Sequence, residues 1–289
     1  MLKSFRSEHH LADGDFFGVG EFGAGKGSKA MAGKQENYTK INAETWDHWA
    51  ENGNVWTIPI SHEEFINAKN GEWGVYLTPC KIVPQNWFGP LREAQLLGLA
   101  SGGGQQMPIF SALGAECTLF DYSDRQLEAD ELVAKREGYA IHKIKGDMTK
   151  PLPFADCSFD LIFHPVSNCY IEEVYPVWLE CFRILKSGGI LLAGMDNGMN
   201  YLFEDDSRLP LTVTNQLPFN PLRMKEEEYE RSVKNWNGIQ FSHSLEEQIG
   251  GQLQAGFRLT HLYEDRDREG MSLIREFMPQ YLATRAIKP

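Results

Sequence analysis

One short stretch, residues 96–106, restricts the fold of this chain more than any other. It is an apolar run that ends in three consecutive glycines, Gly102 to Gly104, and the next apolar run ends at Asp121. Glycine lets the main chain adopt positive φ and approach a ligand closely, because it has no Cβ. An acid at the end of the second strand can accept hydrogen bonds from both hydroxyls of a ribose. The stretch therefore predicts strand, glycine-rich turn, helix and strand, with a cofactor that contains a nucleoside.

From Glu93 onward, apolar runs of strand length alternate with helical stretches, which is typical of parallel strands joined by right-handed crossovers. We expect strands at 95–100, 116–121, 140–145, 159–164, 189–195, 257–263 and 277–287. We expect helices at 105–113, 124–138, 171–185 and 244–255. The predicted fold is α/β: a doubly wound, Rossmann-like, seven-stranded and mostly parallel sheet.

The chain divides into three parts. Residues 1–36 are glycine-rich without periodicity, which predicts a flexible leader or an extension foreign to the natural protein. Within it, residues 20–27 nearly spell a phosphate-binding loop, but a glycine stands where the hydroxyl of Ser or Thr is needed. Residues 37–92, with a helix near 42–51, form an N-terminal cap segment rich in tryptophan. Residues 93–289 form the nucleotide-binding domain, and a proline-rich insertion at 197–243 is expected to cover its site.

Composition limits the partners. With 28 basic and 40 acidic residues the net charge is −12, which argues against nucleic acid and acidic membranes and favours a small-molecule substrate. Five scattered cysteines without a C-x-x-C pair favour a reduced, cytoplasmic protein. No apolar run approaches the ~20 residues of a membrane span, and the histidines lack metal-ligand spacing, so no metal is expected. The sequence does not determine an oligomeric state.

Four further motifs, which follow one another along the chain, indicate which cofactor is bound. Phe120–Ser123, Gly146–Met148, Ser158–Ile162 and Phe182–Gly189 together resemble the class I S-adenosylmethionine-dependent methyltransferases. The resemblance is close over residues 93–195 and looser after 243. The chain from about Tyr38 also resembles a bacterial subgroup, similar to methyltransferase type 11, whose glycine turn reads Leu-Ala-Ser-Gly-Gly-Gly-Gln-Gln. The resemblance implies S-adenosylmethionine as cofactor, S-adenosylhomocysteine as product, and methyl transfer by in-line displacement.

The same resemblance implies roles for individual residues. Asp121 would accept both ribose hydroxyls, and Asp147 would accept the adenine amino group. The other residues implied to contact the cofactor lie in the glycine turn and at the strand ends: Ala100, Ser101, Gly102, Gly104, Gln105, Tyr122, Gln126, Met148 and His164. His164 would face the methyl group and serve as the catalytic base, if the acceptor needs one. Asn168, Tyr170 and Trp46 would orient the substrate.

Other interpretations remain open at this point. Asp121 could simply cap the following helix, Asp147 could end a strand in a turn, and a histidine before a proline often satisfies local backbone groups. Gly98 stands where similar enzymes carry an acid, and Ala100 where they carry a glycine; Gln105 or Gln106 could compensate. A protein that binds S-adenosylmethionine without turnover is therefore an alternative. An NAD-dependent oxidoreductase is a more distant one, because G-x-G-x-x-G is not matched.

Overall fold

The computed structural model describes the backbone of residues 27–289 and the side chains of Lys34 and residues 37–289. Most of the predicted leader, including the glycine-rich segment 20–26, lies outside the described residues. The first described helix, α1, spans Gly27–Glu51. It thus begins well before residue 42, where the sequence predicted a helix start, because residues 27–36 carry no apolar periodicity that would reveal it.

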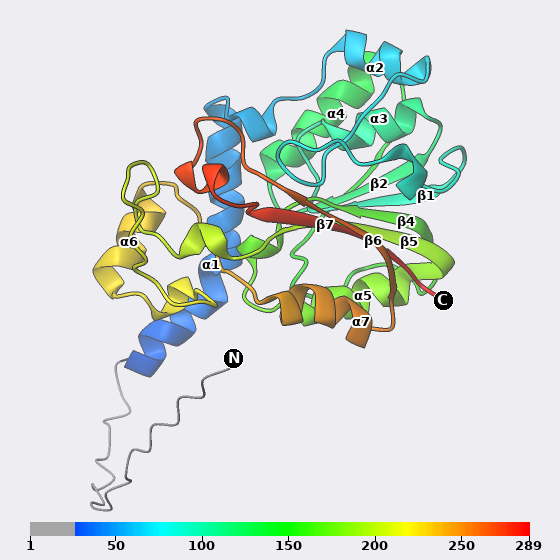
Figure 1. The fold of residues 1–289 in the computed structure, drawn as a ribbon. Helices are drawn as coiled ribbons and strands as arrows, with labels where there is room; N and C mark the ends of the chain where they lie inside the picture. Colours follow the sequence, from blue (N-terminus) through cyan, green and yellow to red (C-terminus); the bar gives the residue numbers. More distant parts are fainter. Residues whose placement is uncertain (1–26) are drawn as a thin grey trace, which may run out of the picture.

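The core is a seven-stranded sheet with the strand order β3-β2-β1-β4-β5-β7-β6 (Figure 1). The strands are β1 Gln95–Leu99, β2 Glu116–Asp121, β3 His142–Lys145, β4 Phe159–His164, β5 Leu185–Asp196, β6 Arg258–Asp265 and β7 Tyr281–Ile287. All pairs are parallel except those of β7 with β5 and β6. The doubly wound, mostly parallel sheet predicted from the sequence is therefore confirmed.

Helices cover both faces of the sheet (Figure 1). One face carries α2 His62–Lys69, α3 Gln106–Ala112 and α4 Asp124–Glu137. The other carries α5 Tyr175–Ile184 and a π-helical turn, Glu246–Gly250, that continues into α7 Gly251–Gln254. Side chains of a strand alternate between the two cores: Leu96 packs in the cluster with Phe110, and Leu97 in the cluster with Trp178.

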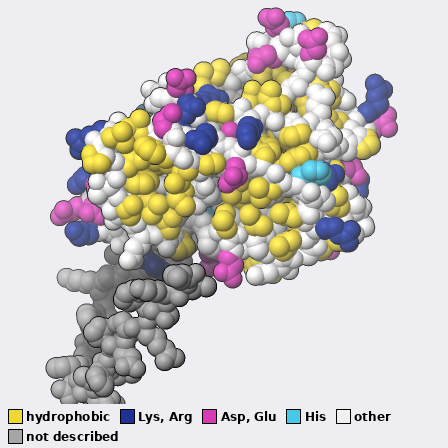
Figure 2. Space-filling view, viewed as in Figure 1, with side chains coloured by type: hydrophobic (Ala, Val, Ile, Leu, Met, Phe, Trp, Pro, Cys, Tyr) yellow, Lys and Arg dark blue, Asp and Glu magenta, His cyan; other side chains and the backbone are white. Residues whose placement is uncertain are grey.

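The segment 197–243 packs against α1 and also contacts the start of β7, where Asn200 Nδ2 donates to Tyr281 Oη at 3.2 Å. It contains the 3-10 turns Met199–Tyr201 and Pro221–Arg223 and helix α6 Glu226–Lys234. Its small core joins Leu222, Tyr229, Ile239 and Phe241 to Tyr38 of α1. Figure 2 shows hydrophobic side chains gathered on the side of the molecule that carries this segment. Leu209 and Val213 are more than half exposed there.

Polar side chains of α1 attach this helix to the segment 197–243 on one side and to the start of α4 on the other. Asn42 Oδ1 accepts a hydrogen bond from Ile239 N at 2.6 Å, and its Nδ2 donates to Ile239 O at 2.9 Å and Tyr170 O at 3.1 Å. One turn on, Asp47 Oδ1 accepts from Ser123 Oγ at 2.6 Å and from Arg125 N at 3.0 Å, at the start of α4. Helix α1 therefore fixes the segment 197–243 relative to the sheet.

Two further observations limit the fold. In the part of the chain that the structure describes, no helix combines the length and apolarity needed to cross a bilayer. Within the same residues, no three His, Cys, Asp or Glu side chains come together in a group that could hold a metal ion.

Candidate active site

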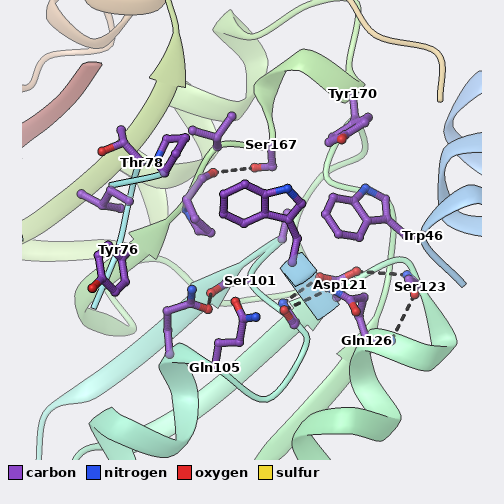
Figure 3. A pocket seen from close by; sticks show the side chains of 18 of the residues that line it. Trp46, Tyr76, Thr78, Ser101, Gln105, Asp121, Ser123, Gln126, Ser167 and Tyr170 are labelled. Carbon is purple, nitrogen blue, oxygen red and sulfur yellow. Dashed lines mark hydrogen bonds between the residues drawn. The ribbon is translucent and has the colours of Figure 1, made fainter. Parts of the chain in front are cut away.

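A cavity of about 1030 Å³ lies at the carboxyl ends of the parallel strands. This is the edge of an open α/β sheet where ligands bind. The cavity is at the upper end of the range of about 300–1,000 Å³ for small-molecule sites. Figure 3 shows Ser101, Gln105 and Asp121 along one side of it and Thr78 and Tyr170 along the other.

Two walls of the cavity come from different parts of the chain. The first, here the turn wall, comes from the turn after β1 and the ends of β2 and β3: Ala100, Ser101, Gly102, Gln105, Asp121, Tyr122, Gln126, Asp147 and Met148. The second, here the aromatic wall, comes from α1, the loops after β4 and β5, and the start of β7: Trp46, Trp49, Cys169, Tyr170, Asp196, Tyr201 and Tyr281. Every predicted site residue lies in one of these walls except Gly104, His164 and Asn168.

Close approach explains the glycine turn. Gly102 N donates a hydrogen bond to Asp121 Oδ2 at 2.9 Å. A Cβ on Gly102 would lie 2.9 Å from that oxygen and 2.6 Å from Gln126 Cβ, so any side chain would push the turn away. The turn and the acid at the end of β2 therefore form one cradle that only glycine permits.

Asp121 has the geometry of a ligand-binding carboxylate. Its Oδ1 accepts a hydrogen bond from Ser123 N at 3.0 Å (Figure 3). Burial raises the pKa of Asp121, although the backbone hydrogen bonds from Ser123 and Gly102 lower it. Ser123, whose Oγ accepts from Gln126 N at 3.1 Å, caps α4, so the capping role considered for Asp121 belongs to its neighbour. Each carboxylate oxygen keeps lone pairs for a further hydrogen bond from the cavity.

Gly104, which was predicted to contact the cofactor, supports the turn from behind and does not line the cavity. Its N–H donates to Asp130 Oδ2 at 2.8 Å, and its carbonyl accepts from Ile60 N at 2.9 Å. Asp130 lies on α4, is fully buried, and has its pKa raised to about 7 by that burial. Sequence reasoning missed Asp130, although an acid on the apolar face of the helix predicted at 124–138 is a signal for such a role.

His164, the predicted catalytic base, lies in the core rather than in the lining of the cavity. It ends β4 and is fully buried; Nδ1 lies 2.9 Å from Leu99 O and Nε2 lies 2.8 Å from Asn168 Oδ1. Asn168 is fully buried too, and its Nδ2 donates to Gln248 Oε1 at 2.8 Å. Burial lowers the pKa of His164. Both ring nitrogens are engaged inside the protein, and neither His164 nor Asn168 lines the cavity in this structure.

The two departures at the turn have physical reasons. A Cβ on Gly98 would lie 2.6 Å from Met107 Sδ, because the buried Met107 fills the space that an acid would need. Ala100 has φ +47°, a left-handed conformation that favours glycine, and its N–H donates to Phe120 O at 2.8 Å. The turn therefore keeps its shape at the expense of some backbone strain.

The aromatic wall contains a carboxylate that sequence reasoning missed. Asp196 ends β5, is 2% exposed, and has its pKa raised to about 6 by burial. Trp46 meets Tyr170 edge to face, with ring centroids 5.6 Å apart, and packs against Trp49 at 5.0 Å. The signal for Asp196 was available: like Asp121, it is an acid at the end of an apolar strand, next to a turn with glycine.

Comparison with known proteins decides the family. A methyltransferase domain model matches residues 97–193. An uncharacterized methyltransferase of Bacillus subtilis, YbaJ, is 40% identical over 250 residues, which are 86% of this chain and 97% of that protein. The chain belongs to the class I S-adenosylmethionine-dependent methyltransferases. S-adenosylmethionine is its cofactor.

Solved structures agree on the fold of this methyltransferase. An S-adenosylmethionine-dependent methyltransferase from Mesorhizobium loti has a TM-score of 0.53 at 16% identity, over 70% of this chain and 94% of that one. A similar protein from Listeria monocytogenes has a TM-score of 0.53 at 17% identity, over 71% of this chain and 95% of that one.

Proposed function

We propose that this methyltransferase transfers the methyl group of S-adenosylmethionine to a small molecule bound against the aromatic wall. The observation that carries the proposal is that the turn wall and the aromatic wall line the same cavity. The cavity volume of about 1030 Å³ is sufficient for two small molecules side by side. A donor on one wall and an acceptor on the other would then meet without an intervening barrier.

On the turn wall, we assign the cofactor contacts implied by the sequence to the residues that line it. Asp121 would accept the ribose hydroxyls and Asp147 the adenine amino group, with Tyr122 and Met148 beside the ring. Gln126 Nε2 donates to Gly102 O at 3.2 Å, while its buried Oε1 has no partner among the described residues. A buried acceptor without a donor is unfavourable, so a donor from the cofactor at this place would stabilise both.

The charge of the lining supports a small acceptor over nucleic acid. Six described side chains of the lining are acidic and one, Arg268, is basic. Arg268 itself lies over the ring of Trp56 in the cap segment, 4.0 Å from the ring centroid. A phosphate backbone would meet repulsion here, whereas a neutral or cationic small molecule would not.

The chemistry asks little of the protein beyond alignment. The sulfonium of the bound cofactor supplies an activated methyl group. The chain must hold the acceptor atom in line with the sulfur–methyl bond and exclude water from that line. The packed rings of Trp46, Trp49 and Tyr170 would provide both, because they form a rigid apolar surface on α1 and after β4.

Calorimetric titration with S-adenosylhomocysteine, with NAD as control, tests the turn wall. We expect S-adenosylhomocysteine alone to bind; binding of NAD alone, or of neither, would contradict the proposal. Incubation with methyl-labelled S-adenosylmethionine and fractionated cell extract tests the acceptor. We expect label in the low-molecular-mass fraction, and label confined to RNA or protein would contradict a small-molecule acceptor.

A further inference from the structure

Asp196 is a carboxylate without a counter-ion on the wall opposite the glycine turn. Its Oδ1 accepts a hydrogen bond from Gly198 N at 2.9 Å, whereas its buried Oδ2 has no partner among the described residues. No positive charge in the part of the chain that the structure describes acts on it. A buried carboxylate in this state is unfavourable unless a ligand supplies the missing partner.

Aromatic rings surround this carboxylate. Tyr170, Tyr201 and Tyr281 line the cavity together with Cys169. Burial is the main reason that the pKa values of these four groups are raised, and the charge of Asp196 raises them further. They therefore stay neutral near pH 7. A negative charge among neutral aromatic rings is a favourable place for a cation, which gains both the carboxylate and the ring faces.

We infer that Asp196 binds the ammonium group of the methyl acceptor and accepts its proton, so that the acceptor is a primary or secondary amine. The inference rests on the proposed function, because it concerns the acceptor in the same cavity. Asp121 differs from Asp196, because both of its oxygens already accept main-chain hydrogen bonds, from Gly102 N and Ser123 N on the turn wall.

The step balances within the site. An N–H bond of the ammonium group breaks, its proton goes to Oδ2 of Asp196, and the electron pair stays on nitrogen. That pair forms the new N–C bond while the C–S bond breaks with its electrons on sulfur. The products are an N-methylammonium ion and a neutral thioether, and Asp196 returns its proton to water as they leave. Burial favours this transfer, because it raises the proton affinity of a carboxylate and lowers that of an amine.

Two probes of equal shape test the inference. The protein saturated with S-adenosylhomocysteine is titrated with benzylamine and with benzyl alcohol. We expect benzylamine to bind about tenfold or more tightly, the ratio of a charge-assisted hydrogen bond, and Asp196→Asn to remove the difference. Asp267→Asn is the matched control, because Asp267 also lines the cavity but its Oδ2 already accepts from Tyr281 Oη at 3.4 Å. This variant should keep the preference.

The outcomes of these titrations distinguish the amine assignment from its failure. Equal affinities in the unchanged protein, no binding of benzylamine, or a preference that survives Asp196→Asn would overturn the amine assignment. Titration with S-adenosylhomocysteine separates this failure from that of the proposed function. If S-adenosylhomocysteine binds and the amine preference is missing, only the inference fails; if S-adenosylhomocysteine does not bind, the proposed function fails.

Discussion

The two walls of the cavity are held by different forces. The turn wall is fixed by main-chain N–H groups that donate to carboxylates, as Gly102 N does to Asp121 at 2.9 Å and Gly104 N to Asp130 at 2.8 Å. The aromatic wall is fixed by ring packing, as between Trp46 and Tyr170 at 5.6 Å, and by the amide of Asn42 behind it. The turn wall is therefore held by hydrogen bonds to carboxylates, whereas the aromatic wall is held mainly by the packing of its rings.

This difference follows from distance along the chain. The turn wall draws on residues 100–148, which are consecutive strand ends of one sheet. The aromatic wall joins α1 to residues more than a hundred positions away, with Asn42 reaching Tyr170 and Ile239. Enzymes that share a cofactor need the same turn wall, so its sequence pattern is fixed. The aromatic wall, built by the cap segment and the insertion, can vary between related enzymes with their acceptors.

The largest effect is expected where the aromatic wall depends on a single buried amide. Asn42→Ala leaves Ile239 N and the carbonyls of Ile239 and Tyr170 without their partner. We expect the free energy of unfolding in urea to fall by about 3 kcal/mol, the cost of such buried groups. Asn52→Ala is the control, because Asn52 is exposed and directly follows α1. This variant should lower the free energy of unfolding by less than about 0.5 kcal/mol. Equal losses would mean that Asn42 does not hold this wall.

The effect of the turn wall should be clearest in cofactor binding. Asp121→Ala removes the carboxylate proposed for the ribose hydroxyls, and we expect the affinity for S-adenosylhomocysteine to fall by about ten- to a hundredfold. Asp124→Ala, three residues on and paired with Lys145 at the surface, should leave the affinity unchanged. Calorimetry compares the two variants, and an unaltered affinity in Asp121→Ala would contradict the ribose assignment.

Lowering the pH should reduce the preference of the aromatic wall for amines. Because burial raises the pKa of Asp196 to about 6, its carboxylate is charged at pH 7.5 and mostly neutral at pH 5. Cys169, Tyr170, Tyr201 and Tyr281 face it and stay neutral over this range, since burial raises their pKa values. The ratio of benzylamine to benzyl alcohol affinity should therefore fall by about tenfold from pH 7.5 to pH 5. A constant ratio would show that another group sets the preference.

The smallest effect is expected at the strained residue of the turn. Ala100→Gly relieves a left-handed conformation that costs about 1–2 kcal/mol, but it also adds about 0.4–1 kcal/mol of chain entropy to the unfolded state. We expect a net stabilisation of about 0.5 kcal/mol in thermal unfolding. A loss of stability above about 1 kcal/mol would mean that the Ala100 methyl group packs usefully in the turn.

Local patterns were enough to predict the sheet and the turn wall. The ranges of β2 and β4 agree with the sequence prediction residue by residue, because each is a short apolar run bounded by turn residues. The start of α1 could not be predicted, since its first ten residues lack an apolar stripe. That helix gains its stability from packing on Leu222 and Phe241, far along the chain.

The role of His164 could not be settled from sequence. A histidine at the end of a strand can point into a cleft or into the core, and here the core position depends on Asn168 and on Gln248, 80 positions further on. Asp196 could have been found, because the reasoning applied to Asp121 holds for any acid that ends a parallel strand at this edge. The sequence could not show that Asp196 has no counter-ion, because this depends on which side chains pack around it.

A crystal structure with S-adenosylhomocysteine tests the central claim that one cavity holds donor and acceptor on opposite walls. The account predicts ribose hydroxyls within hydrogen-bond distance of Asp121 and free volume between the sulfur and Asp196. A ligand that fills the space beside Asp196, or that binds away from Asp121, would contradict it.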